Sequence, residues 1–222
     1  MGLLDVLKSR KSESDKLRHR TDVLNYLIRL KGYRRYLEIG VRTPKDNFDK
    51  IRAQEKFGVE PNPRKPISYK MTSDAFFEQL RLDPTAKPFH LVFVDGLHLA
   101  TQVERDVHNA LDFLGDDGTI VLHDCNPLTA DAQIDDYDGK KLWNGTVWKA
   151  WAKLRAEQPG LSMQVIDMDH GLGIIRRGRQ VLFHLDSTDY DKMDFALLDA
   201  RRKELLNLVD VETFKRSLLA RS

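Results

Sequence analysis

Residues 89–124 read FHLVFVDGLHLATQVERDVHNALDFLGDDGTIVLHD. The first six residues are apolar, aromatic or β-branched, and their number is typical of a short buried strand. A second apolar run, residues 119–122, predicts another strand after the GDDG turn. Between the two, apolar residues recur at helical spacing, at Val103, Val107, Leu111 and Leu114. Such a strand–helix–strand unit makes two parallel strands whose carboxyl ends lie at one edge of a sheet.

Polar residues follow both of these strands. Asp95 and His98 come after the first strand, and His123 and Asp124 come after the second. Open α/β sheets bind ligands in the crevice outside the carboxyl ends of their strands. We therefore expect these four side chains to converge on a ligand-binding edge.

The rest of the chain supplies further elements of the same kind. Strands are expected at 35–40, 56–60 and 67–69, and a hairpin at 163–176. Helices are expected at 21–31, from the cap residues Ser73 or Asp74 onward, at 143–156, from 191 through Val209, and at 211–219. The pattern predicts a doubly wound, Rossmann-like α/β fold with a seven-stranded, mostly parallel sheet and the hairpin as its antiparallel edge. We divide the chain into an N-terminal helical segment (1–32), a ligand-binding domain (33–178) and a C-terminal helical extension packed on it (179–222).

Two helix starts carry the pattern of a capping box. Thr101 with Glu104 would begin the helix of the 89–124 unit, and Thr43 with Asp46 would begin a helix just after Gly40. The free N–H groups of that second helix would point at an anionic group above Gly40.

Composition limits the class of protein. The chain has 222 residues, 41% of them hydrophobic and 32% charged, which is typical of a soluble globular protein. It has no apolar run long enough for a membrane span and no signal-peptide pattern at its N-terminus. A single cysteine, Cys125, excludes an internal disulfide and indicates a reducing compartment, so we expect a cytoplasmic protein, either monomeric or homo-oligomeric.

The charges are unevenly distributed although the net charge is only +2. Residues 95–138 contain eleven Asp and Glu against one basic residue, and they surround the expected ligand edge. A negative field of this kind repels phosphate backbones, so we expect no nucleic-acid partner. Residues 1–35 contain ten Lys and Arg against four acids, which we interpret as a solvated helix rather than a polyanion site.

Three successive strands are each expected to end in an acid, namely Glu38, Glu60 and Asp95. Their common edge, next to the turn at Gly40, favours a nucleoside-like ligand. Glu60 would accept hydrogen bonds from both ribose hydroxyls, as the acid after the second strand does in dinucleotide sites.

An ordered set of motifs resembles class I S-adenosylmethionine-dependent methyltransferases: LEIG (37–40), VE (59–60), SD (73–74), VDGLH (94–98) and LHD (122–124). The set is most similar to the bacterial branch that contains macrocin-type sugar O-methyltransferases, over residues 33–178. The resemblance implies S-adenosylmethionine as cofactor. The residues expected to bind it are Glu38 and Gly40 at the methionine part, Glu60 at the ribose, Ser73 and Asp74 at the adenine, and Asp95.

The resemblance also implies a catalytic centre. Asp95 and Asp124 would hold a divalent metal, Mg or Mn, and His98 would be the base that takes a proton from the acceptor hydroxyl. The interpretation of His98 as a structural residue bonded to a helix end stays open, as does the presence of the metal. His123 stands where the family has an acid, and imidazole suits Mn, Fe or Zn better than Mg.

We therefore expect methyl transfer to a hydroxyl of a small-molecule acceptor, such as a sugar or a glycan precursor. One alternative is a catalytically silent scaffold in surface-glycan assembly, because the glycine-rich loop is reduced to GVRTP (40–44). A nicotinamide-dependent oxidoreductase is the other alternative, and it is disfavoured because the same loop lacks the glycines that a pyrophosphate needs.

Overall fold

Apolar residues on both faces of the central strands determine the layered architecture. In the computed structural model, which describes residues 16–137, 139, 142–185 and 192–219, Val92 and Val94 pack into one core while Leu91 and Phe93 pack into another. A strand buried on both faces needs a layer of helices on each side, as in α/β proteins.

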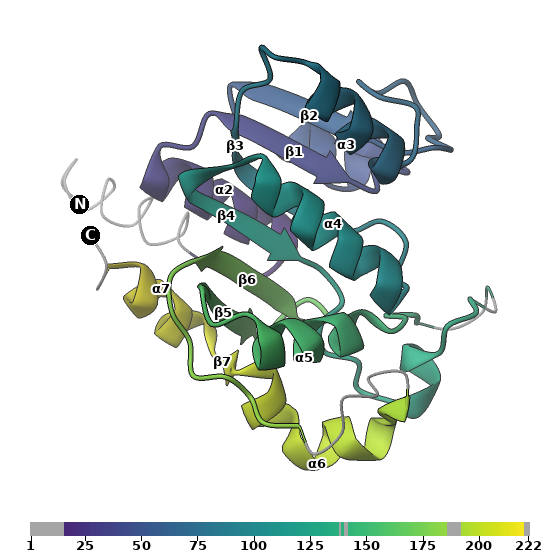
Figure 1. The fold of residues 1–222 in the computed structure, drawn as a ribbon, viewed down its shortest axis with the longest axis vertical. Helices are drawn as coiled ribbons and strands as arrows, with labels where there is room; N and C mark the ends of the chain where they lie inside the picture. The colour runs from purple at the N-terminus through teal and green to yellow at the C-terminus, as the bar shows by residue number, and fades with distance from the viewer. Residues whose placement is uncertain (1–15, 138, 140–141, 186–191, 220–222) are drawn as a thin grey trace, which may run out of the picture.

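The described residues form one seven-stranded sheet in the order β2-β1-β3-β4-β6-β5-β7 (Figure 1). Its strands are β1 (Arg35–Ile39), β2 (Glu55–Val59), β3 (Phe89–Val94), β4 (Leu114–Leu122), β5 (Leu161–Ile166), β6 (Leu172–Arg177) and β7 (Leu208–Val209). The pairs β2–β1, β1–β3, β3–β4 and β5–β7 are parallel, whereas β6 runs antiparallel to both of its neighbours. The predicted fold, a mostly parallel sheet with an antiparallel hairpin, is confirmed.

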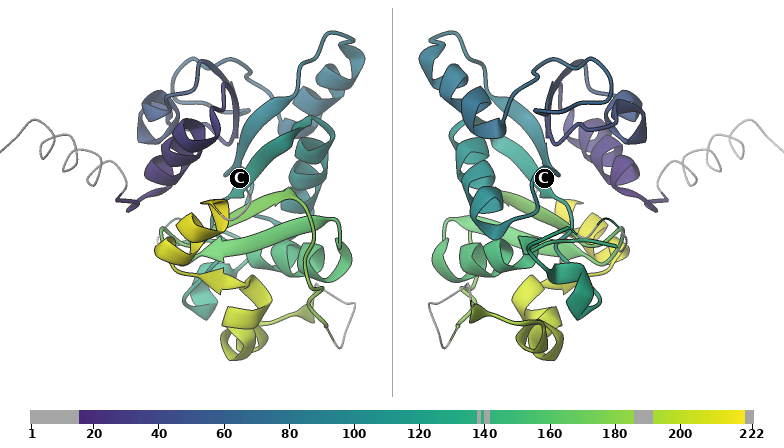
Figure 2. Two further views of the ribbon diagram at one scale, coloured as in Figure 1. Left: turned by 90° about the vertical axis from the view of Figure 1, so that its left-hand side faces the viewer. Right: turned by 90° about the vertical axis from the view of Figure 1, so that its right-hand side faces the viewer.

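Helices cover the two faces of the sheet unequally (Figure 2). One core contains side chains of α3 (Ser73–Leu82), α4 (Ala100–Asp112), α5 (Val147–Glu157) and α6 (Phe195–Leu206). The opposite core is closed by α2 (Arg20–Lys31) and α7 (Val211–Leu219), which come from opposite ends of the described chain. The part of the expected N-terminal segment at residues 1–15 lies outside the described residues.

Three local expectations are wrong. Gly40 is followed by two short 3₁₀ turns, η1 (Pro44–Asp46) and η2 (Phe48–Lys50), and the Thr43 side chain makes no capping hydrogen bond. An anion site at a regular helix start is therefore absent there. The N-cap of α4 is Leu99 rather than Thr101, and the N-cap of α3 is Thr72, whose hydroxyl accepts from the N–H of Ala75.

The C-terminal edge of the sheet also differs from the expectation. The hairpin of β5 and β6 lies inside the sheet, and Leu208–Val209 adds β7 at the edge instead of continuing the preceding helix. Asn207 ends α6 in the left-handed conformation, with φ of 47°, and turns the chain back along β5. Within the described residues, no helix is long and apolar enough to cross a membrane.

Candidate active site

Two cavities meet at the carboxyl ends of β1, β2 and β3. The larger has a volume of about 570 Å³, and its lining includes Glu38, Asp95, His98 and Asp124. The smaller has a volume of about 310 Å³, and its lining includes Ser73, Asp74, Leu97 and Gln102. Both are lined by Gly40, Glu60 and Gly96, so they form one cleft that bends around the end of β1. The structure thus brings all of the site residues expected from the sequence to this cleft.

Glu38 is a buried acid in the wall of the larger cavity, with 4% of its surface exposed. Its Oε2 accepts hydrogen bonds from the Tyr36 hydroxyl (2.5 Å) and from the Asn47 side-chain amide (2.9 Å). Burial raises the pKa of the Glu38 carboxyl to about 7 in spite of these donors, because desolvation disfavours the charged form. Glu38 is thus a carboxyl group able to hold or release a proton near neutral pH.

Gly40 sits at the join of the two cavities with φ of 98°, a conformation that side chains rarely adopt. A Cβ atom at this position would collide with the carbonyl oxygen of Asp95. The first glycine of the reduced loop is therefore required for β1 and β3 to approach each other at the cleft.

The smaller cavity is supported by polar contacts from α4. The two N–H groups of Gln102 Nε2 are shared among three acceptors: Ser73 Oγ (3.2 Å), Asp74 Oδ1 (3.2 Å) and Asp106 Oδ1 (3.0 Å). Asp106 is buried, and its burial raises the pKa of its carboxyl to about 6. Glu60, at the shared edge, accepts from the backbone N–H of Asn62 (2.9 Å), which orients its carboxylate.

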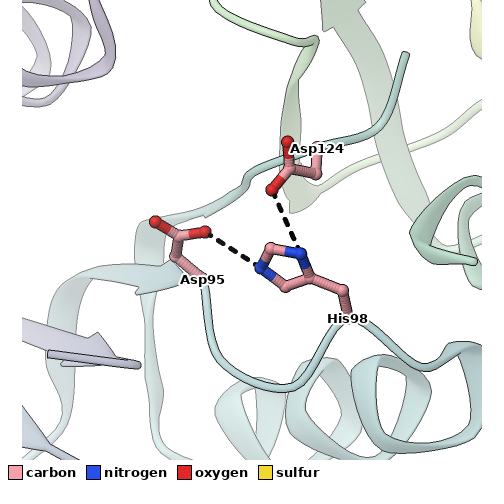
Figure 3. A group of neighbouring side chains, drawn as sticks. All are labelled: Asp95, His98 and Asp124. Atoms are coloured by element: carbon pink, nitrogen blue, oxygen red, sulfur yellow. Dashed lines mark ion pairs between the residues drawn. The ribbon is translucent and has the colours of Figure 1, made fainter. Parts of the chain in front are cut away.

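Asp95, His98 and Asp124 form a cluster in the larger cavity (Figure 3). His98 lies between the two acids: Nε2 is 3.4 Å from Asp95 Oδ1, and Nδ1 is 3.4 Å from Asp124 Oδ2. Burial lowers the pKa of His98, but the two carboxylates outweigh it, so the pKa is raised above the ordinary value. One donor atom from each residue lies within 4.8 Å of the others, a spacing that fits a divalent ion.

His123 holds the two acids together from the side of the sheet. Its Nδ1 lies 3.1 Å from Asp95 Oδ1 and 3.0 Å from Asp124 Oδ2, and its Nε2 faces Asp169 at 3.7 Å. Burial disfavours the imidazolium, yet these carboxylates raise the pKa of His123 well above its ordinary value. The backbone N–H of Arg20 donates to Asp169 Oδ2 (2.7 Å), and Arg20 Nη1 lies 3.0 Å from His123 Nε2. The first residue of α2 is thereby connected to the cleft.

Asn144, Gly145 and Thr146 position the cluster from the start of α5. The Asn144 amide donates to Asp124 Oδ1 (2.7 Å), and Asp124 has the left-handed φ of 62°. The backbone N–H of Thr146 donates to the carbonyl of His98 (2.8 Å), and its hydroxyl accepts from the N–H of Ala100 (3.0 Å). Gly145 packs directly on His98, where a Cβ atom would collide with the His98 carbonyl.

Two of these contributors were missed by the sequence analysis. Asn47 lies in a turn and Arg20 at a helix start, and their partners belong to other elements. A buried polar residue beside an expected turn was the only signal, and it does not identify a partner. Cys125 is fully buried, and burial raises the pKa of its thiol.

Comparisons with known proteins agree with the fold. Residues 22–125, just under half of the chain, match the family model described as a methyltransferase domain. No curated protein sequence gives a significant match.

Solved structures share the architecture at low sequence identity. An O-methyltransferase from Bacillus cereus, in complex with S-adenosylhomocysteine, has 15% identity and a TM-score of 0.50, covering 78% of this chain and 88% of its own. TomG from Streptomyces achromogenes, an O-methyltransferase of tomaymycin synthesis in complex with S-adenosylmethionine, has 16% identity and a TM-score of 0.51, covering 71% and 79%. The S-adenosylhomocysteine-bound methyltransferase PaMTH1 from Podospora anserina has 17% identity and a TM-score of 0.52, covering 76% and 82%.

The family match and the architecture agree on the fold. The chain has the Rossmann-like fold that these methyltransferase structures share, and residues 22–125 match the model of a methyltransferase domain.

Proposed function

We propose that the protein transfers a methyl group from S-adenosylmethionine to a hydroxyl of a sugar or another small polar acceptor. The observation that supports this proposal most is the bent cleft around Gly40. Ser73 and Asp74 lie on one arm, the Asp95–His98–Asp124 cluster lies on the other, and Glu60 lies where the two arms meet. One arm suits a nucleoside and the other a reacting centre.

The cofactor residues follow from this division. Ser73 and Asp74 line the smaller cavity and would bind the adenine, with Gln102 orienting both side chains. Glu60, at the shared edge, would bind the ribose hydroxyls. Glu38 and Gly40 would contact the methionine part, which places the sulfonium methyl in the larger cavity near Asp95.

The chain's own residues account for the chemistry by positioning and proton transfer. The acceptor oxygen attacks the methyl carbon in line with the breaking carbon–sulfur bond, and S-adenosylhomocysteine leaves as a neutral thioether. His98 takes the hydroxyl proton, and the carboxylates on both sides of its ring stabilise the imidazolium that results.

The two acids of the cluster also suit a divalent ion. Asp95 and Asp124 would hold it through carboxylate oxygens, and Mg is commonly bound by one or two carboxylates with water completing its coordination. When bound, such an ion would make the acceptor hydroxyl more acidic.

A thermal-shift titration with S-adenosylmethionine, S-adenosylhomocysteine and NAD tests the proposal. We expect the first two ligands alone to stabilise the protein, by about 2.7 kcal/mol at one hundred times the dissociation constant. Glu60→Gln should weaken this effect, whereas Glu78→Gln, at an exposed position on α3, should not. Stabilisation by NAD alone would indicate an oxidoreductase, and no response to any ligand would favour the scaffold function.

A further inference from the structure

Exposed apolar side chains line the cleft. Of ten large hydrophobic side chains exposed among the described residues, three line its two cavities, namely Leu97, Tyr137 and Leu142. Exposed apolar surface in a cavity marks a place where a ligand removes that surface from water. Tyr137 and Leu142 line the larger cavity together with Trp143, and we call these three residues the ring wall.

The ring wall begins at the proposed point of methyl transfer. The indole of Trp143 stacks on the imidazole of His98, with ring centroids 4.8 Å apart and an angle of 20° between the planes. Tyr137 packs on Trp143 at 5.3 Å and 37°. An acceptor whose hydroxyl reaches His98 would therefore lie alongside these aromatic rings.

Hydrogen bonds hold Trp143, the residue of the ring wall next to His98, in place. Trp143 Nε1 donates to the carbonyl of Ile134 (2.6 Å), and the backbone N–H of Asn144 donates to the carbonyl of Ala132 (2.7 Å). Trp148 Nε1 also donates to Gln133 Oε1 (2.9 Å), which fixes the same segment to α5. A Trp143 ring that is already held in this way loses little conformational entropy when a ligand packs on it.

We propose that the ring wall binds the apolar face of a ring-shaped acceptor, so that a hydroxyl on the ring edge points to Asp95, His98 and Asp124. The inference rests on the proposed methyl transfer and specifies its acceptor. A pyranose with an apolar C–H face and a hydroxylated arene share this chemistry, because both place a flat apolar surface on aromatic side chains. A flexible open-chain alcohol lacks such a surface.

Binding of three probes to the protein saturated with S-adenosylhomocysteine tests the inference: methyl α-L-rhamnopyranoside, catechol and, as the open-chain control, propane-1,2-diol. We expect one of the two ring probes to bind by calorimetry, which identifies a sugar or an arene acceptor, and the diol to bind at least about tenfold more weakly. Tyr137→Ala and Trp143→Ala should weaken ring binding by about fivefold or more, whereas Trp143→Phe should retain it within about twofold.

Leu128→Ala is the matched control, because Leu128 is exposed in the same segment but does not line the larger cavity. It should leave ring binding unchanged, and all four variants should bind S-adenosylhomocysteine as the parent protein does. Trp148 and Trp151 are fully buried, so acrylamide should quench mainly the emission of Trp143, and a bound ring should protect it.

Three results would overturn the inference while cofactor binding stays intact: equal binding of the diol and the rings, unchanged ring binding in Tyr137→Ala and Trp143→Ala, or no ring binding at all. Failure of S-adenosylhomocysteine itself to bind would instead overturn the proposed function.

Discussion

His98 lies with its two ring nitrogens between the carboxylates of Asp95 and Asp124, so removal of the ring separates its possible roles. As a general base it would contribute about 10²- to 10⁴-fold to the rate. We expect His98→Ala to lower kcat by that factor while the affinities for S-adenosylhomocysteine and Mn²⁺, measured by calorimetry, change little. Asp124→Asn is the comparison variant, and it should lose Mn²⁺ binding. Equal loss of turnover and of Mn²⁺ affinity in His98→Ala would show that His98 is a metal ligand.

Glu38 gives a prediction about stability and pH. Its pKa is raised from 4.5 to about 7 in the folded protein by burial, so folding favours the protonated form. Its contribution to stability is therefore fully present below about pH 4.5 and is lost as the pH rises through about 7, a change on the order of 3 kcal/mol. Glu38→Gln keeps a neutral side chain of the same shape at every pH. As the pH rises from 5 to 8, the free energy of unfolding of this variant, measured with urea, should increase relative to that of the parent protein.

The control for this measurement is Glu78→Gln, because Glu78 is exposed on α3. A parallel pH profile for Glu38→Gln and the parent protein would contradict the raised pKa. Asp106, with its pKa of about 6, remains in both proteins. It should make the free energy of unfolding of both proteins fall as the pH rises.

For individual residues, the sequence predicted which acids meet at the cleft, but it did not predict the residues that contact them there. Glu38, Glu60 and Asp95 converge because parallel strands end at a common edge, which the strand pattern alone implies. Arg20 and Asn144 reach the cluster through contacts that span 103 and 20 residues, respectively, and no local periodicity encodes such contacts.

The first turn of α4 is capped by a residue that precedes another helix, α5. Thr146 Oγ1 accepts from the N–H of Ala100, whereas Thr101, the cap expected from the sequence, is exposed within the first turn. Thr146→Val removes the acceptor but keeps the shape, and it should destabilise the protein by about 1 kcal/mol. Thr101→Ala should change the free energy of unfolding by less than about 0.5 kcal/mol. Urea unfolding of both variants checks this, and the reverse ranking would restore the predicted capping box.

The sequence predicted most of the helices and strands, but it did not predict the residues at which they begin and end. Strands such as β3 and helices such as α7 follow directly from apolar periodicity. The 3₁₀ turns after Gly40 were expected to be one helix, because Thr43, Pro44 and Asp46 have the composition of a helix start. Pro44 and Asn47 are buried in the folded protein, and such tertiary packing cannot be read from local composition.

For the molecule as a whole, we propose that α2, the sheet and α7 unfold together, although the sequence suggested three segments. Phe214 of α7 is fully buried in the core that α2 closes from the other end of the chain. Phe214→Ala should therefore cost about 3–5 kcal/mol in a single cooperative transition. Leu219→Ala, at a residue 60% exposed, should cost little. A separate early transition in Phe214→Ala, seen by circular dichroism, would show that α7 is an independent appendage.

The tripeptide Asn144-Gly145-Thr146 has a consequence for engineering acceptor preference. It directly follows Trp143, and it carries the hydrogen bonds to Asp124, His98 and Ala100. A designer who transplants residues 128–143 from another enzyme would exchange the acceptor surface. If the graft also shifts the next three positions, the hydrogen bonds that position Asp124 and His98 are lost. An exchange of the acceptor surface therefore has to keep Asn144-Gly145-Thr146 and the carbonyl of residue 132, which accepts from Asn144 and Gly145, in their present positions.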